Sequence, residues 1–284
     1  MVATGMSIHV GLNNVDPGEY AGWNGELIAC ENDANDMAEL AKQAGFKDTT
    51  LLTADATVEN VNKELRKAAK KLVSGDILLF TYSGHGGQVP DINGPEDEPD
   101  RLDETMCFFN REYIDDELHK EFEGFAEGVR ILAFMDSCHS GSGIKVREIL
   151  TPKAMQEQFQ TKDPNEIEKN SRLMPLKKQA ELYKRDKERY DKIQLELDAR
   201  DRREVGATAV LISACLDNQL AADGLRNGLF TAKVLQVWNS GQFTGGYKAF
   251  HREILKQMPA NQSPNLFVTG RNNPRYLRQR PFTV

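Results

Sequence analysis

Short apolar runs alternate with amphipathic stretches along the first 150 residues of the chain. The apolar runs have strand length, and they predict five strands, at residues 7–13, 49–53, 76–82, 105–109 and 129–135. Apolar residues at helical spacing predict helices between these strands, at residues 32–43, 58–72 (capped by Thr57) and 115–122. This alternation predicts an α/β sandwich with a largely parallel central sheet.

The pattern changes between residues 151 and 204, where 14 Lys and Arg and 12 Asp and Glu make up about half of the 54 positions. Residues 179–203 favour a helix but carry few apolar positions, which is typical of an exposed helical arm or of a linker. The core pattern then returns, with strands at 208–213 and 266–268 and helices at 228–239 and 247–257. We therefore expect one α/β domain, made of residues 1–150 and 205–284, that a charged insert at 151–204 interrupts.

Composition narrows the classes of function. The 284 residues carry a net charge of −7, which argues against a broad nucleic-acid-binding surface. No apolar run is long enough to cross a membrane, and the N-terminus lacks the basic and then apolar pattern of a signal peptide. The four cysteines lie far apart and form no CxxC pair, so we expect reduced thiols and a cytoplasmic protein with no nucleic-acid or membrane partner.

Two polar motifs follow predicted strands, at the edge of the sheet where functional groups gather. They are Ser83-Gly84-His85-Gly86-Gly87-Gln88 and Asp136-Ser137-Cys138-His139-Ser140-Gly141. A Cys nucleophile needs a base, and glycines let backbone N–H groups approach a substrate oxygen. A lone His or Cys at a strand end is more often structural, and zinc binding by His85, Cys138 and His139 is conceivable, although the spacing is unusual for zinc. The combination of both motifs favours a Cys–His pair for acyl transfer.

These motifs resemble the signature of metacaspases and of their bacterial relatives, the orthocaspases, which are caspase-like cysteine peptidases. Further segments agree with the family, namely residues 30–34, 213–223, 228–231 and 261–264. The resemblance spans nearly the whole chain except the charged insert. It implies a caspase-like three-layer sandwich.

The resemblance also implies roles for individual residues. Cys138 would be the nucleophile that forms a thioester, and His85 the general base and acid. The backbone N–H groups of Gly86 and Cys138 would form the oxyanion hole, and His139 would have a supporting role. Asp33 and Asp136, with Ser83 and Cys30 nearby, correspond to the substrate pocket.

The acidity of that pocket predicts the substrate, because buried carboxylates bind Arg or Lys through charge-assisted hydrogen bonds. We therefore expect an endopeptidase that cleaves proteins or peptides after Arg or Lys. Two alternatives stay open: a catalytically silent caspase-like scaffold, and an aspartate-directed caspase, which the acidic pocket opposes.

Regulation is the remaining expectation. Residues 91–104 form an acidic loop with seven carboxylates, and the family's calcium site resembles Asp103 with Asp115 and Asp116, although a solvated acidic loop explains the charge equally well. Basic residues in and near the insert predict zymogen-like cleavage, by the protein itself or by an upstream protease, with candidate sites at Lys145, Arg147, Arg185 and Arg203. The resemblance further implies a monomer.

Overall fold

A six-stranded sheet forms the centre of the computed structural model, which describes residues 2–92, 101–137, 163, 166, 170–198, 205–216 and 219–284. The strand order is β2-β1-β3-β7-β8-β9. Their bounds are β1 Gly5–Gly11, β2 Phe46–Leu52, β3 Ile77–Ser83, β7 Arg130–Asp136, β8 Thr208–Ser213 and β9 Asn265–Gly270. The first five are parallel and β9 is antiparallel to β8, so the sheet is mostly parallel, as the sequence predicts.

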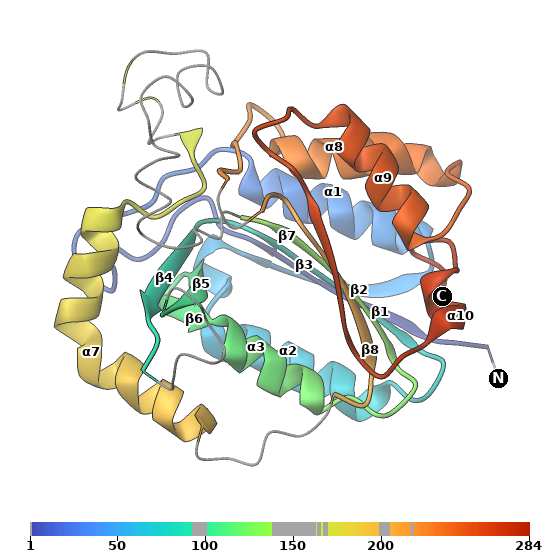
Figure 1. Ribbon diagram of the computed structural model, residues 1–284, viewed down its shortest axis with the longest axis horizontal. Coiled ribbons are helices and arrows are strands. Elements are labelled where there is room, and N and C mark those ends of the chain that lie inside the picture. The colour runs from blue at the N-terminus through green and yellow to red at the C-terminus, as the bar shows by residue number, and fades with distance from the viewer. Residues whose placement is uncertain are drawn as a thin grey trace.

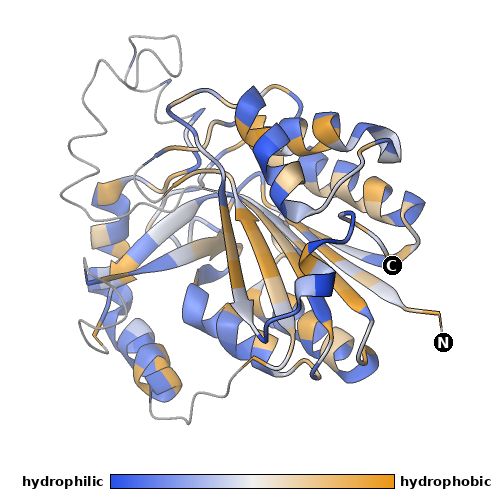
Figure 2. Ribbon diagram, turned by 45° about the vertical axis from the view of Figure 1, so that its right-hand side comes forward, coloured by the Kyte–Doolittle hydropathy of each residue, from blue (hydrophilic) through white to orange (hydrophobic). Residues whose placement is uncertain are grey.

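Helices cover both faces of this sheet (Figure 1). One face carries α1 Cys30–Gln43, α8 Leu229–Trp238 and α9 Tyr247–Gln257; the other carries α2 Val58–Lys71 and α3 Asp115–Glu123. Side chains alternate along each strand, so β3 sends Ile77 and Leu79 to the first core and Leu78 and Phe80 to the second. Figure 2 shows the resulting hydrophobic strands between helices with hydrophilic outer faces.

Strands β7 and β8 pair in parallel, so segments before and after the charged insert belong to the same sheet, as expected. The carboxyl ends of β1, β3 and β7 meet at one edge. Gly11, at the end of β1, allows α1 to begin there, because a Cβ at this position would lie 2.3 Å from the carbonyl oxygen of Cys30. The first turn of α1, which includes Asp33, therefore lies against the functional edge of the sheet.

A second sheet, antiparallel and three-stranded, lies beside this edge. It consists of β4 Gly86–Pro90, β5 Leu102–Phe108 and β6 Arg111–Ile114, in that order. The strand expected at 105–109 belongs here and not to the parallel sheet, because two residues join β5 to β6 and so short a link makes a hairpin. The sequence did not reveal β4, whose two glycines and proline show no strand-like alternation.

Helix α7 (Leu176–Asp198) occupies the second half of the insert and has a kink at Asp186. Its side chains at 179, 182, 190, 194 and 197 are buried, so the expectation of a solvated arm was wrong for this helix. Two glutamines explain the difference. Gln179 accepts a hydrogen bond from the backbone N–H of Gln88, and Gln194 both donates to the carbonyl of Pro90 and accepts from the N–H of Ile92. Helix α7 lies beside β4 (Figure 1), and these polar side chains bind the outer edge of that strand.

Two short 3-10 turns, η1 Thr53–Asp55 and η2 Asn239–Gly241, and the short helix α10 Pro274–Leu277 complete the elements. In the part of the chain that the structure describes, no helix is both long enough and apolar enough to cross a membrane.

Candidate functional site

His85 lies in the short link between β3 and β4, with its side chain almost fully buried. Its Nε2 is 3.1 Å from the carbonyl oxygen of Gly25, and the ring packs against Trp23 at 4.8 Å between ring centroids. Because a carbonyl oxygen accepts only, Nε2 carries the proton and Nδ1 holds the free electron pair. Among the described residues, Nδ1 has no hydrogen-bond partner. Burial lowers the pKa of His85 to about 4, so the imidazole is neutral near pH 7 and can act as a base.

The expected nucleophile, Cys138, lies outside the described residues, as does His139. The described chain at this point ends with Asp136, the last residue of β7, and the buried Ser137. The carbonyl of Ser137 faces the thiol of Cys215, with 3.6 Å between the two atoms. Cys30, Cys107 and Cys215 are buried free thiols, which agrees with the prediction of reduced cysteines for these three.

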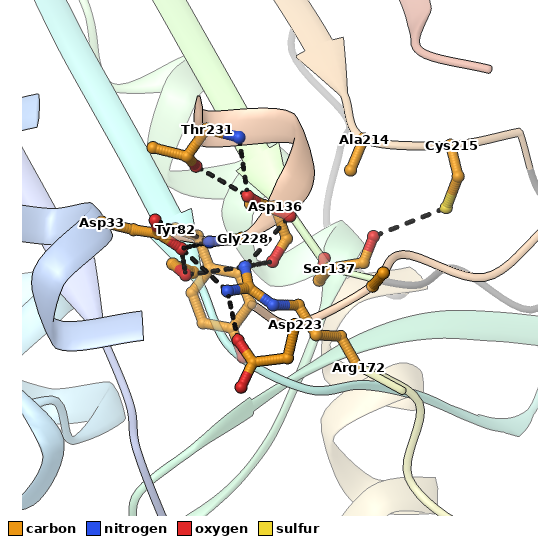
Figure 3. Close-up of polar contacts among 12 residues, drawn as sticks. Asp33, Tyr82, Asp136, Ser137, Arg172, Ala214, Cys215, Asp223, Gly228 and Thr231 are labelled. Atoms are coloured by element: carbon orange, nitrogen blue, oxygen red, sulfur yellow. Dashed lines mark hydrogen bonds and ion pairs between the residues drawn. The ribbon is translucent and has the colours of Figure 1, made fainter. Parts of the chain in front are cut away.

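Three carboxylates converge on one guanidinium at the ends of β3 and β7 (Figure 3). Arg172, from the charged insert, is completely buried. Its Nη2 lies 2.8 Å from an Asp33 oxygen and 2.9 Å from an Asp223 oxygen, and its Nη1 lies 3.0 Å from an Asp136 oxygen. The two aspartates predicted from the sequence are therefore brought together, and a third joins them.

Neutral donors hold the carboxylates in place. The hydroxyl of Ser83 donates to Asp33 at 2.7 Å, and the N–H of Gly228 donates to the same carboxylate at 3.0 Å. Thr231 donates to Asp136 from its backbone N–H at 2.9 Å and from its hydroxyl at 2.6 Å. Thr231 lies in the first turn of α8, where unpaired N–H groups favour an anion. The acidic pocket, which we define as Asp33, Asp136 and Asp223, is thus a built cation site.

The wall of this pocket requires a glycine. A Cβ on Gly228 would lie 2.5 Å from Nη2 of Arg172 and 2.6 Å from an Asp136 oxygen. Ser83 also contacts the guanidinium in the pocket directly, since Nη1 of Arg172 donates to the Ser83 hydroxyl at 2.8 Å. Burial raises the pKa of the Cys30 thiol far above its usual range, so Cys30 is a neutral part of the lining.

Burial also changes the ionisation of one carboxylate of the pocket, Asp33. Burial raises the pKa of Asp33 to about 6, even though the guanidinium of Arg172 favours the charged form. Three buried carboxylates against one guanidinium leave a net negative charge. Carboxylates grouped in this way favour a cation over an anion between them.

Gly86, the other residue expected in the oxyanion hole, is the first residue of β4. Its backbone N–H donates to the carbonyl oxygen of Arg172 at 2.9 Å. This N–H is therefore aimed at the backbone carbonyl of the residue whose side chain fills the acidic pocket.

The expected calcium ligands lie farther along the small sheet. Asp103 is a buried residue of β5, and Asp115 and Asp116 begin α3. The described residues contain no cluster of three or more His, Cys, Asp or Glu side chains that could hold a metal ion. Calcium binding at these three aspartates stays a prediction, and no part of the site geometry above depends on it.

Sequence reasoning missed Arg172 and left Asp223, Gly228 and Thr231 without a role, although segments 213–223 and 228–231 were recognised as family-like. The signal for Arg172 is faint. It precedes Leu173-Met174-Pro175, a short apolar run within a stretch that is otherwise charged.

Of the candidate cleavage sites, Arg185 lies on α7 and donates to the carbonyls of Gly18 and Glu19, away from the pocket. Lys145, Arg147 and Arg203 lie outside the described residues.

A mostly parallel sheet with helices on both faces, with a buried His and an acidic pocket at its carboxyl edge, defines a caspase-like α/β protein. A family model described as the caspase domain (peptidase family C14) matches residues 14–281, and the chain belongs to that family. The chain is 30% identical to Metacaspase-1 of Mycosarcoma maydis over 75% of its own length and 57% of the relative, and 35% identical to Metacaspase-1 of Coccidioides immitis over 51% and 33%. It thus spans between a third and somewhat more than half of these curated relatives.

Solved structures agree on the fold. The crystal structure of protein GSU0716 from Geobacter sulfurreducens matches with a TM-score of 0.86 and 46% identity, covering 99% of both chains. Caspase-1 from Spodoptera frugiperda matches with a TM-score of 0.56 over 94% of this chain and 86% of its own, at 13% identity, which supports the caspase fold.

Proposed function

We propose that this chain is a cysteine endopeptidase that cleaves peptide bonds after Arg or Lys. The observation that carries the specificity is the acidic pocket, in which three buried carboxylates hold a guanidinium within 3.0 Å. An Asp side chain in this pocket would meet like charges with no counter-ion, which argues against the aspartate-directed alternative.

Catalysis in this proposal uses His85 and Cys138. The unprotonated Nδ1 of His85 takes the proton of the Cys138 thiol, and the thiolate attacks the carbonyl carbon that follows the pocket-bound side chain. The N–H of Gly86 and that of Cys138 stabilise the oxyanion. The imidazolium then protonates the departing amine, and water hydrolyses the thioester. The hydrogen bond from Nε2 to Gly25 and the ring of Trp23 hold the imidazole in this orientation.

We propose that the protein works on protein substrates as a monomer, that cleavage of the insert activates it, and that calcium at Asp103, Asp115 and Asp116 is an activator. Activity with and without EDTA, together with calcium titration, tests the last point. Light scattering of the purified protein tests the monomer.

The decisive experiment is a cleavage-site profile on a peptide library, measured with and without calcium. We expect cuts after Arg and Lys that disappear in Cys138→Ala and fall to near background in His85→Ala, while both variants keep the wild-type circular dichroism spectrum. Turnover that survives in Cys138→Ala contradicts the assignment of the nucleophile. Efficient cutting after Asp contradicts the pocket argument, and a folded protein that cuts nothing favours the scaffold alternative.

A further inference from the structure

One face of α7 contacts the loop that orients the ring of His85. We define this loop as residues 16–25; it contains Trp23 and Gly25, which both contact the imidazole. The α7 residues that face the loop recur at helical spacing and are Lys178, Leu182, Arg185 and Arg189. A helix of the charged insert is therefore joined to the surroundings of the proposed catalytic base.

Two basic side chains of this face bind backbone carbonyls of the loop. The guanidinium of Arg185 donates to the carbonyl of Gly18 at 3.1 Å and to that of the next residue, Glu19. The ammonium of Lys178 donates to the carbonyl of Ala21 at 3.2 Å. Three carbonyls of one turn are thus held by two cations from α7.

The turn needs such support because its backbone is strained. Ala21 adopts a φ of 51°, a left-handed conformation that is unfavourable for any residue other than glycine and persists only where neighbouring groups hold it. Carboxylates on α7 fix both cations in place: Asp186 accepts from Arg185 at 2.9 and 2.6 Å, and Glu181 accepts from Lys178 at 2.8 Å. The cations are therefore aimed at the loop before they bind it.

A small apolar cluster fills the space between α7 and the loop. Its buried members are Val15, Tyr20, Cys107, Met174 and Leu182. Trp23 packs against this cluster, with 5.9 Å between its ring centroid and that of Tyr20, and 4.8 Å to that of His85. The ring that contacts the imidazole therefore rests on a cluster to which α7 contributes Leu182.

The same helix also binds the strand that begins directly after His85. Gln179 accepts a hydrogen bond from the backbone N–H of Gln88 on β4 at 3.1 Å. Helix α7 therefore holds both the backbone that follows His85 and the loop that accepts the proton of Nε2 at Gly25.

We propose that Lys178 and Arg185 are positioning residues for His85: they hold the loop so that Nε2 donates to Gly25 and Nδ1 stays free to act as the base. This inference rests on the proposed function. Neither residue contacts the acidic pocket, so loss of their contacts should slow the chemical step and leave the binding of Arg unchanged.

The test measures kcat and KM on an Arg peptide for wild type, Lys178→Gln, Arg185→Gln, the double variant and Lys184→Gln. Lys184 is the matched control, because it is basic, exposed and about 100° around the helix from Arg185. We expect each single variant to lose at least threefold in kcat and the double variant at least tenfold, with KM within twofold of wild type. Lys184→Gln should match wild type, and Arg185→Lys should recover at least half of the wild-type kcat, because an ammonium can still donate to these carbonyls.

Alkylation of Cys138 by iodoacetamide, located by mass spectrometry, gives a second readout that needs no substrate. Its rate should fall in the double variant, because a displaced imidazole no longer activates the thiol. Trp23→Ala should also lower the rate, and adding the double variant to it should cost little more, since both act through the same loop.

The outcomes separate this inference from the proposed function. An unchanged kcat and alkylation rate in the double variant, a loss confined to KM, or an equal loss in Lys184→Gln overturns the positioning role. A folded wild type that cleaves no Arg peptide, and whose Cys138 reacts at the same rate after His85→Ala, overturns the proposed function instead.

Discussion

Glu112 allows a quantitative test of how α7 packs on the small sheet. Its carboxyl is fully buried on β6 and accepts a hydrogen bond from Thr105 at 2.7 Å, while its backbone N–H donates to the hydroxyl of Tyr190 on α7. Burial raises the pKa of Glu112 from 4.5 to about 7, against the opposing effect of the two hydroxyls. Between these pH values the folded chain binds a proton that the unfolded chain has released. The free energy of unfolding contributed by Glu112 therefore falls as pH rises through this window.

The size of the effect follows from the two pKa values. A carboxyl that ionises near pH 4.5 when unfolded and near pH 7 when folded costs about 3 kcal/mol above pH 8 relative to below pH 4. Glu112→Gln keeps the shape and the acceptor for Thr105 but cannot ionise. We expect the variant to gain about 2–3 kcal/mol on wild type between pH 5 and pH 8.

Urea unfolding at pH 5, 6, 7 and 8 measures this gain, with both proteins in the Cys138→Ala background to prevent self-cutting. The buried histidines His9 and His85, whose pKa values burial lowers to about 3 and about 4, act with the opposite sign but cancel in the difference. Glu39→Gln on the exposed face of α1 is the control for the loss of one carboxylate. Parallel curves for Glu112→Gln and its background would refute the reasoning from burial.

Three predictions concern the site. Gly228→Ala should lower kcat/KM on Arg peptides at least a hundredfold, because its Cβ would lie 2.5 Å from the bound guanidinium; an unchanged value contradicts the placement of the pocket wall. Asp136→Asn should lower kcat/KM on Arg peptides by about a hundredfold or more, since removing one partner of a buried ion pair costs about 3–5 kcal/mol, and parallel measurement on a Lys peptide shows whether both cations use this carboxylate. Burial lowers the pKa of His85 to about 4, so the imidazole is an available base above that pH and kcat/KM should show no acid limb from His85 near its usual pKa of 6.5. The pKa of Asp33 is about 6 and can produce a limb of its own, so the profile is also measured in Asp33→Asn. An acid limb at 6.5 that persists in this variant contradicts the buried imidazole.

Strands β3 and β7 were predictable because each is a mostly apolar run buried along its whole length, and their parallel pairing follows from the alternation with helices. The small sheet was less visible, since Gly86–Pro90 carries no alternating pattern and its pairing depends on partners far along the chain. A helix was expected at residues 179–203, where α7 lies, but its packing against β4 was not, for a different reason. At two of its buried positions, Gln179 and Gln194 bind strand backbone, so polar residues do there what an apolar stripe normally does.

The site shows the same division. The positions of His85 and Asp136 were predictable because short motifs place them at strand ends, whereas Asp33 lies in a motif that opens α1; the structure brings the two aspartates together. Asp223 and Arg172 reach the pocket from distant segments, and nothing local in the sequence pairs them. Cys138 and the calcium ligands stay predictions.

The way α7 seals β4 has a consequence for how this chain tolerates change in length. Five backbone groups along that edge, from Gly86 to Ile92, find their partners in residues 172–194, and a buried group left unpaired costs about 1–3 kcal/mol. Insertions or deletions inside residues 173–194 would shift the two glutamines out of register with the strand. The unpaired backbone groups of this sheet edge could then pair with other chains and promote aggregation. The length of this segment is therefore expected to be fixed, because Gln179 and Gln194 reach their backbone partners only at their present spacing.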